Sequence, residues 1–136
     1  MLEPIEPHIR PREVFHPADL VVRGWPLTVD ALMDNADSTR SRYSYRGEPF
    51  AAVSADATVA GWDLPSVLSG RRLRTRRRYA QVTTRELIAA GFTLLPTFSL
   101  PHYSIVLGAY AEDEAARLLV VLGPVHHNPH HVRRPK

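Results

Sequence analysis

Residues 79–98 read YAQVTTRELIAAGFTLLPTF, and this stretch decides the fold. Its first four residues predict a short strand. Thr83 and Glu86 then form a capping box, in which the threonine hydroxyl and the glutamate carboxylate satisfy free backbone amides at a helix start. A helix over residues 84–90 follows, and Gly91 ends it in the position where glycine tolerates a left-handed backbone. The stretch therefore predicts a strand followed directly by a helix.

The segment that follows extends this order to residue 128. Pro96 marks the strand over residues 92–98 as an edge or bulged strand, because proline cannot donate to a sheet ladder. The remaining expected elements are a strand over residues 102–107, a helix that begins at the acidic run 112–114 and stops at Gly123-Pro124, and a strand over residues 125–128. The order β-α-β-β-α-β in residues 79–128 predicts an α+β fold, an antiparallel sheet with helices on one face.

The amino-terminal part is broken by proline at positions 4, 7, 11, 17 and 26. Proline fixes φ and pushes the preceding residue toward extended backbone, so residues 1–26 are expected to form an extended arm with at most one short strand, over residues 20–25. Residues 27–136 are then one α+β domain, since the whole chain has the size of a single domain.

Four further elements, two helices and two strands, are expected between the arm and residue 79. Thr28 is a suitable N-cap for a helix that ends near Asn35, where turn-forming residues begin. A strand from Tyr43, a turn over residues 47–49 and a second strand over residues 50–54 follow. Asp63 could cap a short helix that stops before Gly70.

Composition limits the chemistry. The chain has 136 residues and no cysteine, which excludes disulfides, thiolate metal sites and cysteine nucleophiles. There is no amino-terminal apolar segment of the leader type, and no run approaches the roughly 18 apolar residues of a membrane span. We therefore expect a cytosolic protein, and no cofactor or metal is indicated by any motif.

The segment GRRLRTRRRY, residues 70–79, is the most distinctive feature. Guanidinium groups match phosphate oxygens with a planar fork of donors, so this basic strip is a candidate nucleic-acid contact, with RNA favoured over DNA. If the strip is extended, Arg72, Arg74, Arg76 and Arg78 share one face. The expected contacts are Arg71, Arg72, Arg74, Arg76, Arg77, Arg78 and Tyr79.

Two other interpretations of the strip remain open. It could be a solvated loop, because blocks of like charge repel one another and stay exposed. It could also pair with carboxylates, since residues 1–63 carry a net charge of −4 and residues 64–136 one of +7. Such an asymmetry suits either a nucleic-acid face or an acidic half that folds over a basic half.

His102 is the candidate catalytic residue, with Ser99 and Tyr103 beside it. A histidine near hydroxyls and facing arginines has the groups of a metal-independent ribonuclease, in which histidine moves the proton of a 2′-hydroxyl and arginine stabilises the phosphorane. The alternative is a hydrogen-bonded structural histidine at a strand end. In the tail, Pro129 prevents helical pairing of His126 with His130, and the histidine run matches no known zinc spacing. The run is either a polar tail or the source of a base or ligand from His126 or His127.

Tyr45-Arg46-Gly47, Thr97-Phe98-Ser99 and Glu112-Asp113-Glu114 together resemble the Arg, Ser-Thr-Ser and Glu-x-Glu order of arginine-type ADP-ribosyltransferases. The resemblance implies that arginine and serine would support a nicotinamide dinucleotide and that the second glutamate would orient the ribose. The chain departs from that order, because the serine motif is degraded, Ser99 and Glu112 are close in sequence, and the glutamates suit a helix start better than a strand.

The sequence thus predicts a small protein that binds nucleic acid, with a bacterial toxin-like ribonuclease as its enzymatic version. The alternative is a non-enzymatic interaction subunit, of an antitoxin or a complex, that pairs the basic strip with an acidic protein. A homo-oligomer is compatible with either function.

Overall fold

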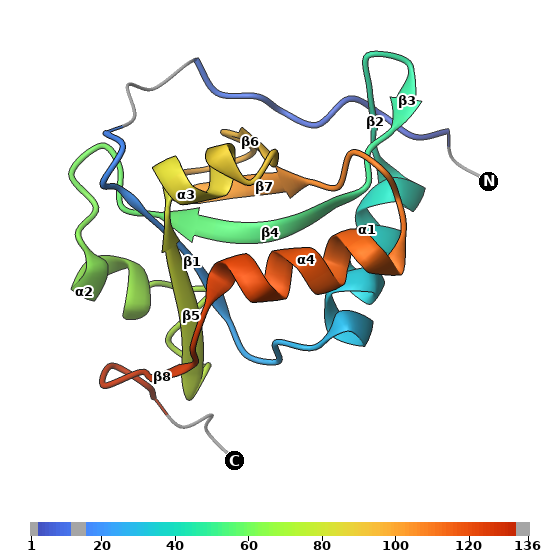
Figure 1. Ribbon diagram of the computed structural model, residues 1–136. Helices are drawn as coiled ribbons and strands as arrows, with labels where there is room; N and C mark the ends of the chain where they lie inside the picture. Colours follow the sequence, from blue (N-terminus) through green and yellow to red (C-terminus); the bar gives the residue numbers. More distant parts are fainter. Residues whose placement is uncertain (1–2, 12–15, 133–136) are drawn as a thin grey trace.

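A computed structural model describes residues 3–11 and 16–132 of the chain. Its main feature is a six-stranded antiparallel sheet with the strand order β6-β7-β4-β1-β5-β8, shown in Figure 1. The strands of this sheet are β1 (Leu20–Gly24), β4 (Ala52–Ala57), β5 (Arg78–Thr83), β6 (Thr93–Leu95), β7 (His102–Val106) and β8 (His126–His127). The helices are α1 (Val29–Arg42), α2 (Leu64–Leu68), α3 (Thr84–Ala89) and α4 (Glu112–Leu122), and a small hairpin joins β2 (Ser44–Tyr45) to β3 (Glu48–Pro49).

The order β5-α3-β6-β7-α4-β8 confirms the predicted β-α-β-β-α-β pattern. The predicted capping box at α3 is confirmed in its first part, because the hydroxyl of Thr83 accepts a hydrogen bond from the Glu86 backbone amide at 3.2 Å. The Glu86 carboxylate accepts from that same hydroxyl at 3.1 Å, and not from the Thr83 backbone amide as predicted. Gly91 follows this helix with φ of 92°, a left-handed conformation that costs glycine little. Strand β6, which ends just before Pro96, lies at an edge of the sheet.

The amino-terminal half differs from the expectation in three places. Strand β1, expected as a short strand within the extended arm, lies between β4 and β5 in the middle of the sheet. Helix α1 begins after its Thr28 cap as expected but continues seven residues past Asn35, to Arg42. The hairpin of β2 and β3 turns at Arg46 and Gly47, whose φ angles are 53° and 83°, and not over residues 47–49. The strand expected over residues 50–54 is β4, which covers residues 52–57.

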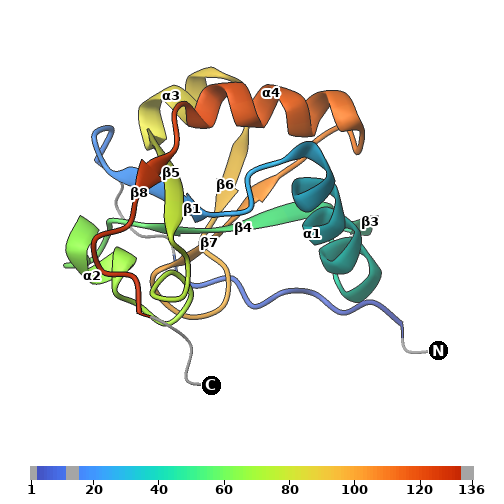
Figure 2. The same cartoon turned by 90° about the horizontal axis from the view of Figure 1, so that it is seen from below.

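The sheet buries a different core on each face. Helices α1, α3 and α4 cover one face, as Figure 2 shows, and pack there on inward-facing residues that include Val21, Val53 and Ile105. The short helix α2 is the exception to the expected one-sided arrangement. It lies on the opposite face, where Val67 and Leu68 pack with Val22. Side chains alternate along β1, so Val21 lies on one face of the sheet and Val22 on the other. This one strand therefore contributes a residue to each of the two cores.

Residues 70–78, here called the arginine loop, complete the second core. Leu73 at the centre of the loop is buried against Val22 and Tyr79. Gly24 permits this approach, because a Cβ atom added there would lie 2.8 Å from Cγ of Arg76 and 2.8 Å from Cδ2 of Leu73. The sequence therefore places its arginines on a loop that is packed against the sheet by one leucine.

We predict that Gly24→Ala destabilises the protein by roughly 1–3 kcal/mol, the usual cost of overpacking a filled core. The added methyl group would push Leu73 out of its place. Chemical denaturation measures the free energy of unfolding. Gly108→Ala is the matched control, because a Cβ atom there meets nothing within 4 Å, and equal stability of the two variants would contradict the close approach.

In the part of the chain that the structure describes, no helix has the length and apolar character needed to cross a bilayer.

Candidate functional site

The arginine loop is a series of turns and not the extended strip that the alternation of arginines would require. The carbonyl oxygen of Gly70 accepts from the amides of Leu73 at 3.2 Å and Arg74 at 2.9 Å, and that of Leu73 accepts from Arg76 at 2.9 Å. Only Arg78 lies in a strand, at the start of β5. The expected alternation of four arginines onto one face therefore does not occur.

Asn128 holds the loop in place. Its side chain is fully buried, and its amide nitrogen donates to the carbonyl oxygens of Leu68 at 3.1 Å, Leu73 at 3.0 Å and Arg76 at 3.1 Å. Its backbone amide donates to the carbonyl oxygen of Arg77 at 2.7 Å. Further along the tail, the amide of Val132 donates to the carbonyl oxygen of Arg74 at 2.7 Å. The carboxy-terminal segment thus fixes the backbone from which the arginines project.

We predict that Asn128→Ala lowers the free energy of unfolding by about 1–3 kcal/mol, because buried loop carbonyls lose their donor. Denaturation monitored by tryptophan fluorescence measures the change, and hydrogen exchange of the loop amides should rise with it. His127→Ala alters an exposed neighbour and is the control. Wild-type protection of the loop amides in Asn128→Ala would show that the clamp is not needed.

Most of the charge on the loop is not neutralised by the described part of the chain. Asp56, on β4, binds Nε of Arg72 at 2.8 Å, and Arg72 also reaches the carbonyl oxygen of Ser99 at 3.5 Å. Asp56 is only 4% exposed, and burial raises the pKa of its carboxyl against the opposing effect of Arg72. Among the described residues, no other carboxylate lies within ion-pair distance of the loop. The five remaining exposed arginines are Arg71, Arg74, Arg76, Arg77 and Arg78.

A hollow of about 160 Å³ lies between the loop and the sheet. Its walls come from the end of β1, from residues 54–56 of β4, and from Arg72, Leu73 and Arg76 of the loop. A second hollow, of about 250 Å³, lies against Trp62, Arg71 and Ser99. Arg72 and Asp56 line both, so their ion pair stands between the two spaces.

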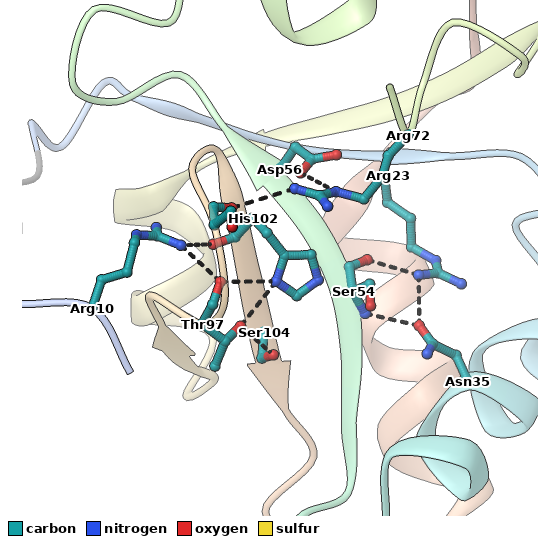
Figure 3. A network of polar contacts seen from close by, with 10 residues as sticks. Arg10, Arg23, Asn35, Ser54, Asp56, Arg72, Thr97, His102 and Ser104 are labelled. Atoms are coloured by element: carbon teal, nitrogen blue, oxygen red, sulfur yellow. Dashed lines mark hydrogen bonds and ion pairs between the residues drawn. The ribbon is translucent and has the colours of Figure 1, made fainter. Parts of the chain in front are cut away.

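Arg23 is the half-buried cation of the first hollow. Strands β1 and β4 pair only at Val21–Ala57 and Val22–Asp56, and beyond that point side chains replace the ladder. Nη1 of Arg23 donates to the carbonyl oxygen of Ser54 at 2.7 Å and to Oδ1 of Asn35 at 3.0 Å, and Asn35 accepts from the amide of Ser54 at 2.8 Å (Figure 3). The side chain of Asn35 is thus hydrogen-bonded to the sheet and does not form a turn, and α1 continues past this residue.

The charge of Arg23 has no carboxylate partner in the described part of the chain. Its Nε is buried and lacks an acceptor among the described residues. Burial, and then the nearby charge of Arg76, lowers the pKa of Arg23 to about 10. Arg23 remains a cation near neutral pH in spite of this shift, so the hollow contains a partly desolvated positive charge.

Trp25 provides an exposed aromatic surface beside these groups. It is 42% exposed, lines the first hollow, and lies with its ring 5.9 Å from the guanidinium of Arg78. Tyr79, expected as a nucleic-acid contact, is only 7% exposed and belongs to the second core. Trp25, which the sequence pattern did not single out, is thus an exposed aromatic ring at the loop, and the half-buried Trp62 lines the second hollow.

The three candidate catalytic residues do not converge on a hollow. His102 is 4% exposed, and its Nδ1 lies 2.9 Å from the hydroxyl of Thr97, as Figure 3 shows. Tyr103 is fully buried, under the guanidinium of Arg10 at 5.0 Å. Only Ser99 is exposed and lines a hollow, the second one. Asp56 and His102 are direct neighbours across β4 and β7, yet His102 lines neither hollow.

Burial, and then the positive charge of Arg72, lowers the pKa of His102 from 6.5 to about 4. Between these values the unfolded chain takes up a proton that the folded chain does not, so we predict that stability falls by about 3 kcal/mol as pH decreases from 6.5 to about 4. Urea denaturation across this window measures the change. The pH dependence should be reduced by this amount in His102→Gln but retained in His127→Gln; an unchanged dependence in His102→Gln would contradict the assignment.

The residues of the other sequence patterns do not form a common site. Arg46 lies in the β2–β3 turn over the ring of Tyr45, and Glu114 pairs with Arg117 on α4, so the ADP-ribosyltransferase-like order has its glutamates at a helix start and not in a strand. His126 and His127 are exposed on the edge strand β8. Within the described residues, no group of three or more histidine, aspartate or glutamate side chains could hold a metal ion.

Comparison of the chain with protein-family models, with curated proteins and with solved structures gives no match.

Proposed function

We propose that this protein binds single-stranded nucleic acid, RNA in preference to DNA, through the arginine loop. The observation that carries the proposal is the group of five exposed arginines without carboxylate partners among the described residues. A solvated loop would be free to spread its charges, whereas this loop is fixed by Asn128 and packed through Leu73. A fixed set of guanidinium groups suits repeated phosphates because less conformational entropy is lost on binding.

Trp25 supports a single strand as the ligand. Unpaired bases stack on exposed aromatic rings and on guanidinium planes. One group of each kind is present where the guanidinium of Arg78 approaches the ring of Trp25. Single strands with splayed bases are the usual targets of RNA-binding proteins, which favours RNA. A protein with this ligand would work in the cytosol.

The observations support binding better than they support ribonuclease activity. A general base must reach the 2′-hydroxyl of the substrate, and His102 is buried with its Nδ1 already bonded to Thr97. The toxin-like ribonuclease stays a prediction that one measurement tests: RNA cleavage by the wild type that is lost in His102→Ala with binding unchanged. The interaction-subunit alternative requires that no RNA bind, even at low salt.

We predict that affinity for a short unstructured RNA, measured by fluorescence anisotropy, decreases linearly in log–log form with salt concentration. Each phosphate contact to a single strand contributes about 0.7 to that slope, so Arg74→Gln and Arg77→Gln should each weaken binding and lower the slope by about this amount. Both side chains are exposed and neither forms an ion pair with a described residue, so both variants should fold normally.

Arg85→Gln is the matched control for charge, because Arg85 is exposed on α3, a helix of the opposite face. Its loss should leave the slope unchanged. If the arginine-loop variants bind RNA as tightly as Arg85→Gln, or if the wild type does not bind at low salt, the proposal is wrong.

A further inference from the structure

The hollow between β1 and the arginine loop has an excess of positive charge. Arg23, Arg72 and Arg76 line it, and the carboxylate among its lining residues is Asp56. Asp56 is engaged by Nε of Arg72 at 2.8 Å, so this pair is neutral and Arg72 is held in a fixed orientation. Arg23 and Arg76 then contribute two charges that no lining group balances.

Arg23 is the more informative of these two residues. Arg23 is half-buried. Moving a cation even partly out of water is costly unless it is paired, and proteins normally pair such a cation with a carboxylate. Here the partners of Arg23 are the neutral oxygens of Asn35 and Ser54, and the nearby charge on Arg76 repels it. An anion in the hollow would remove both penalties. The arrangement is therefore that of a site whose counter-charge comes from a ligand.

We propose that this hollow binds a phosphate monoester, either the terminal phosphate of a bound strand or that of a free mononucleotide. A monoester carries a charge close to −2 near neutral pH, which matches the two unbalanced guanidinium groups, whereas a backbone diester carries only −1. Its three terminal oxygens also suit several forked donors. The strand-end version rests on the proposed RNA binding; the mononucleotide version does not.

Size and surroundings agree with this ligand. The hollow of about 160 Å³ is smaller than the roughly 300–1,000 Å³ that drug-sized ligands occupy, so it suits a phosphate group and not a whole nucleotide. Trp25 at the rim gives the attached ribose or base a surface to stack on. Asp56 does not oppose the anion at full strength, because its carboxylate is directed to Arg72.

The test compares three labelled RNAs of one sequence, with a 5′-phosphate, a 3′-phosphate or hydroxyl groups at both ends, in anisotropy titrations. One phosphorylated RNA should bind at least about ten-fold tighter than the hydroxyl-ended RNA, as expected when a charge-assisted contact is added. Arg76→Gln should abolish this preference. Arg71→Gln, an exposed arginine of the same loop that lines only the second hollow, should keep it.

Calorimetry with adenosine monophosphate, and with adenosine as its control, tests the mononucleotide source. Binding of the monophosphate alone, lost in Arg76→Gln and in Arg23→Lys, supports the proposal even if no RNA binds. The change of Arg23 to lysine keeps the charge but loses the fork, and circular dichroism verifies that each variant is folded. RNA binding without an end preference, together with no binding of the monophosphate, would overturn this inference while leaving the proposed function intact.

Discussion

The three hydrogen bonds from the buried amide of Asn128, to Leu68 at the end of α2 and to Leu73 and Arg76 of the arginine loop, determine how this surface of the protein is organised. Six guanidinium groups within eight residues repel one another, and repulsion alone would extend the segment. The turns persist because their carbonyl oxygens accept hydrogen bonds within the fold. Backbone polar groups that are excluded from solvent need such partners. Leu73 adds an apolar anchor to the polar one. The loop is thus held by its backbone and its leucine, which leaves its arginines exposed, five of them without a carboxylate partner among the described residues.

A second constraint, the early separation of β1 from β4, creates the space beneath the loop. Once the ladder ends at Asp56, the backbone of Ser54 needs other partners, and Arg23 and Asn35 supply them. A sheet that stayed paired to its end would need no guanidinium at this position. The separation of β1 from β4 therefore accounts both for the hollow and for the half-buried cation that lines it.

The sequence predicted the fold where its signals were local. The capping box at Thr83, the glycine at 91 and the acidic start of α4 each act within a few residues, so β5-α3-β6-β7-α4-β8 followed from them. The central position of β1 did not follow, because a five-residue strand between prolines has no local mark of its neighbours. Asn35 was a misleading stop signal, since its side-chain amide serves the sheet and not a turn.

The site was predictable only in its composition. The arginines are evident in the sequence, but their clamp lies more than fifty residues away and resembles part of a polar histidine tail. The structure also separates two roles that the sequence had combined. Burial, and then the charge of Arg72, lowers the pKa of His102 to about 4 and keeps the ring neutral. A neutral ring could accept a proton, but this one is enclosed in the interior and bonded to Thr97. The arginines of the loop are therefore at the surface, whereas the histidine that a ribonuclease would need is buried. This separation favours the proposed binding over cleavage.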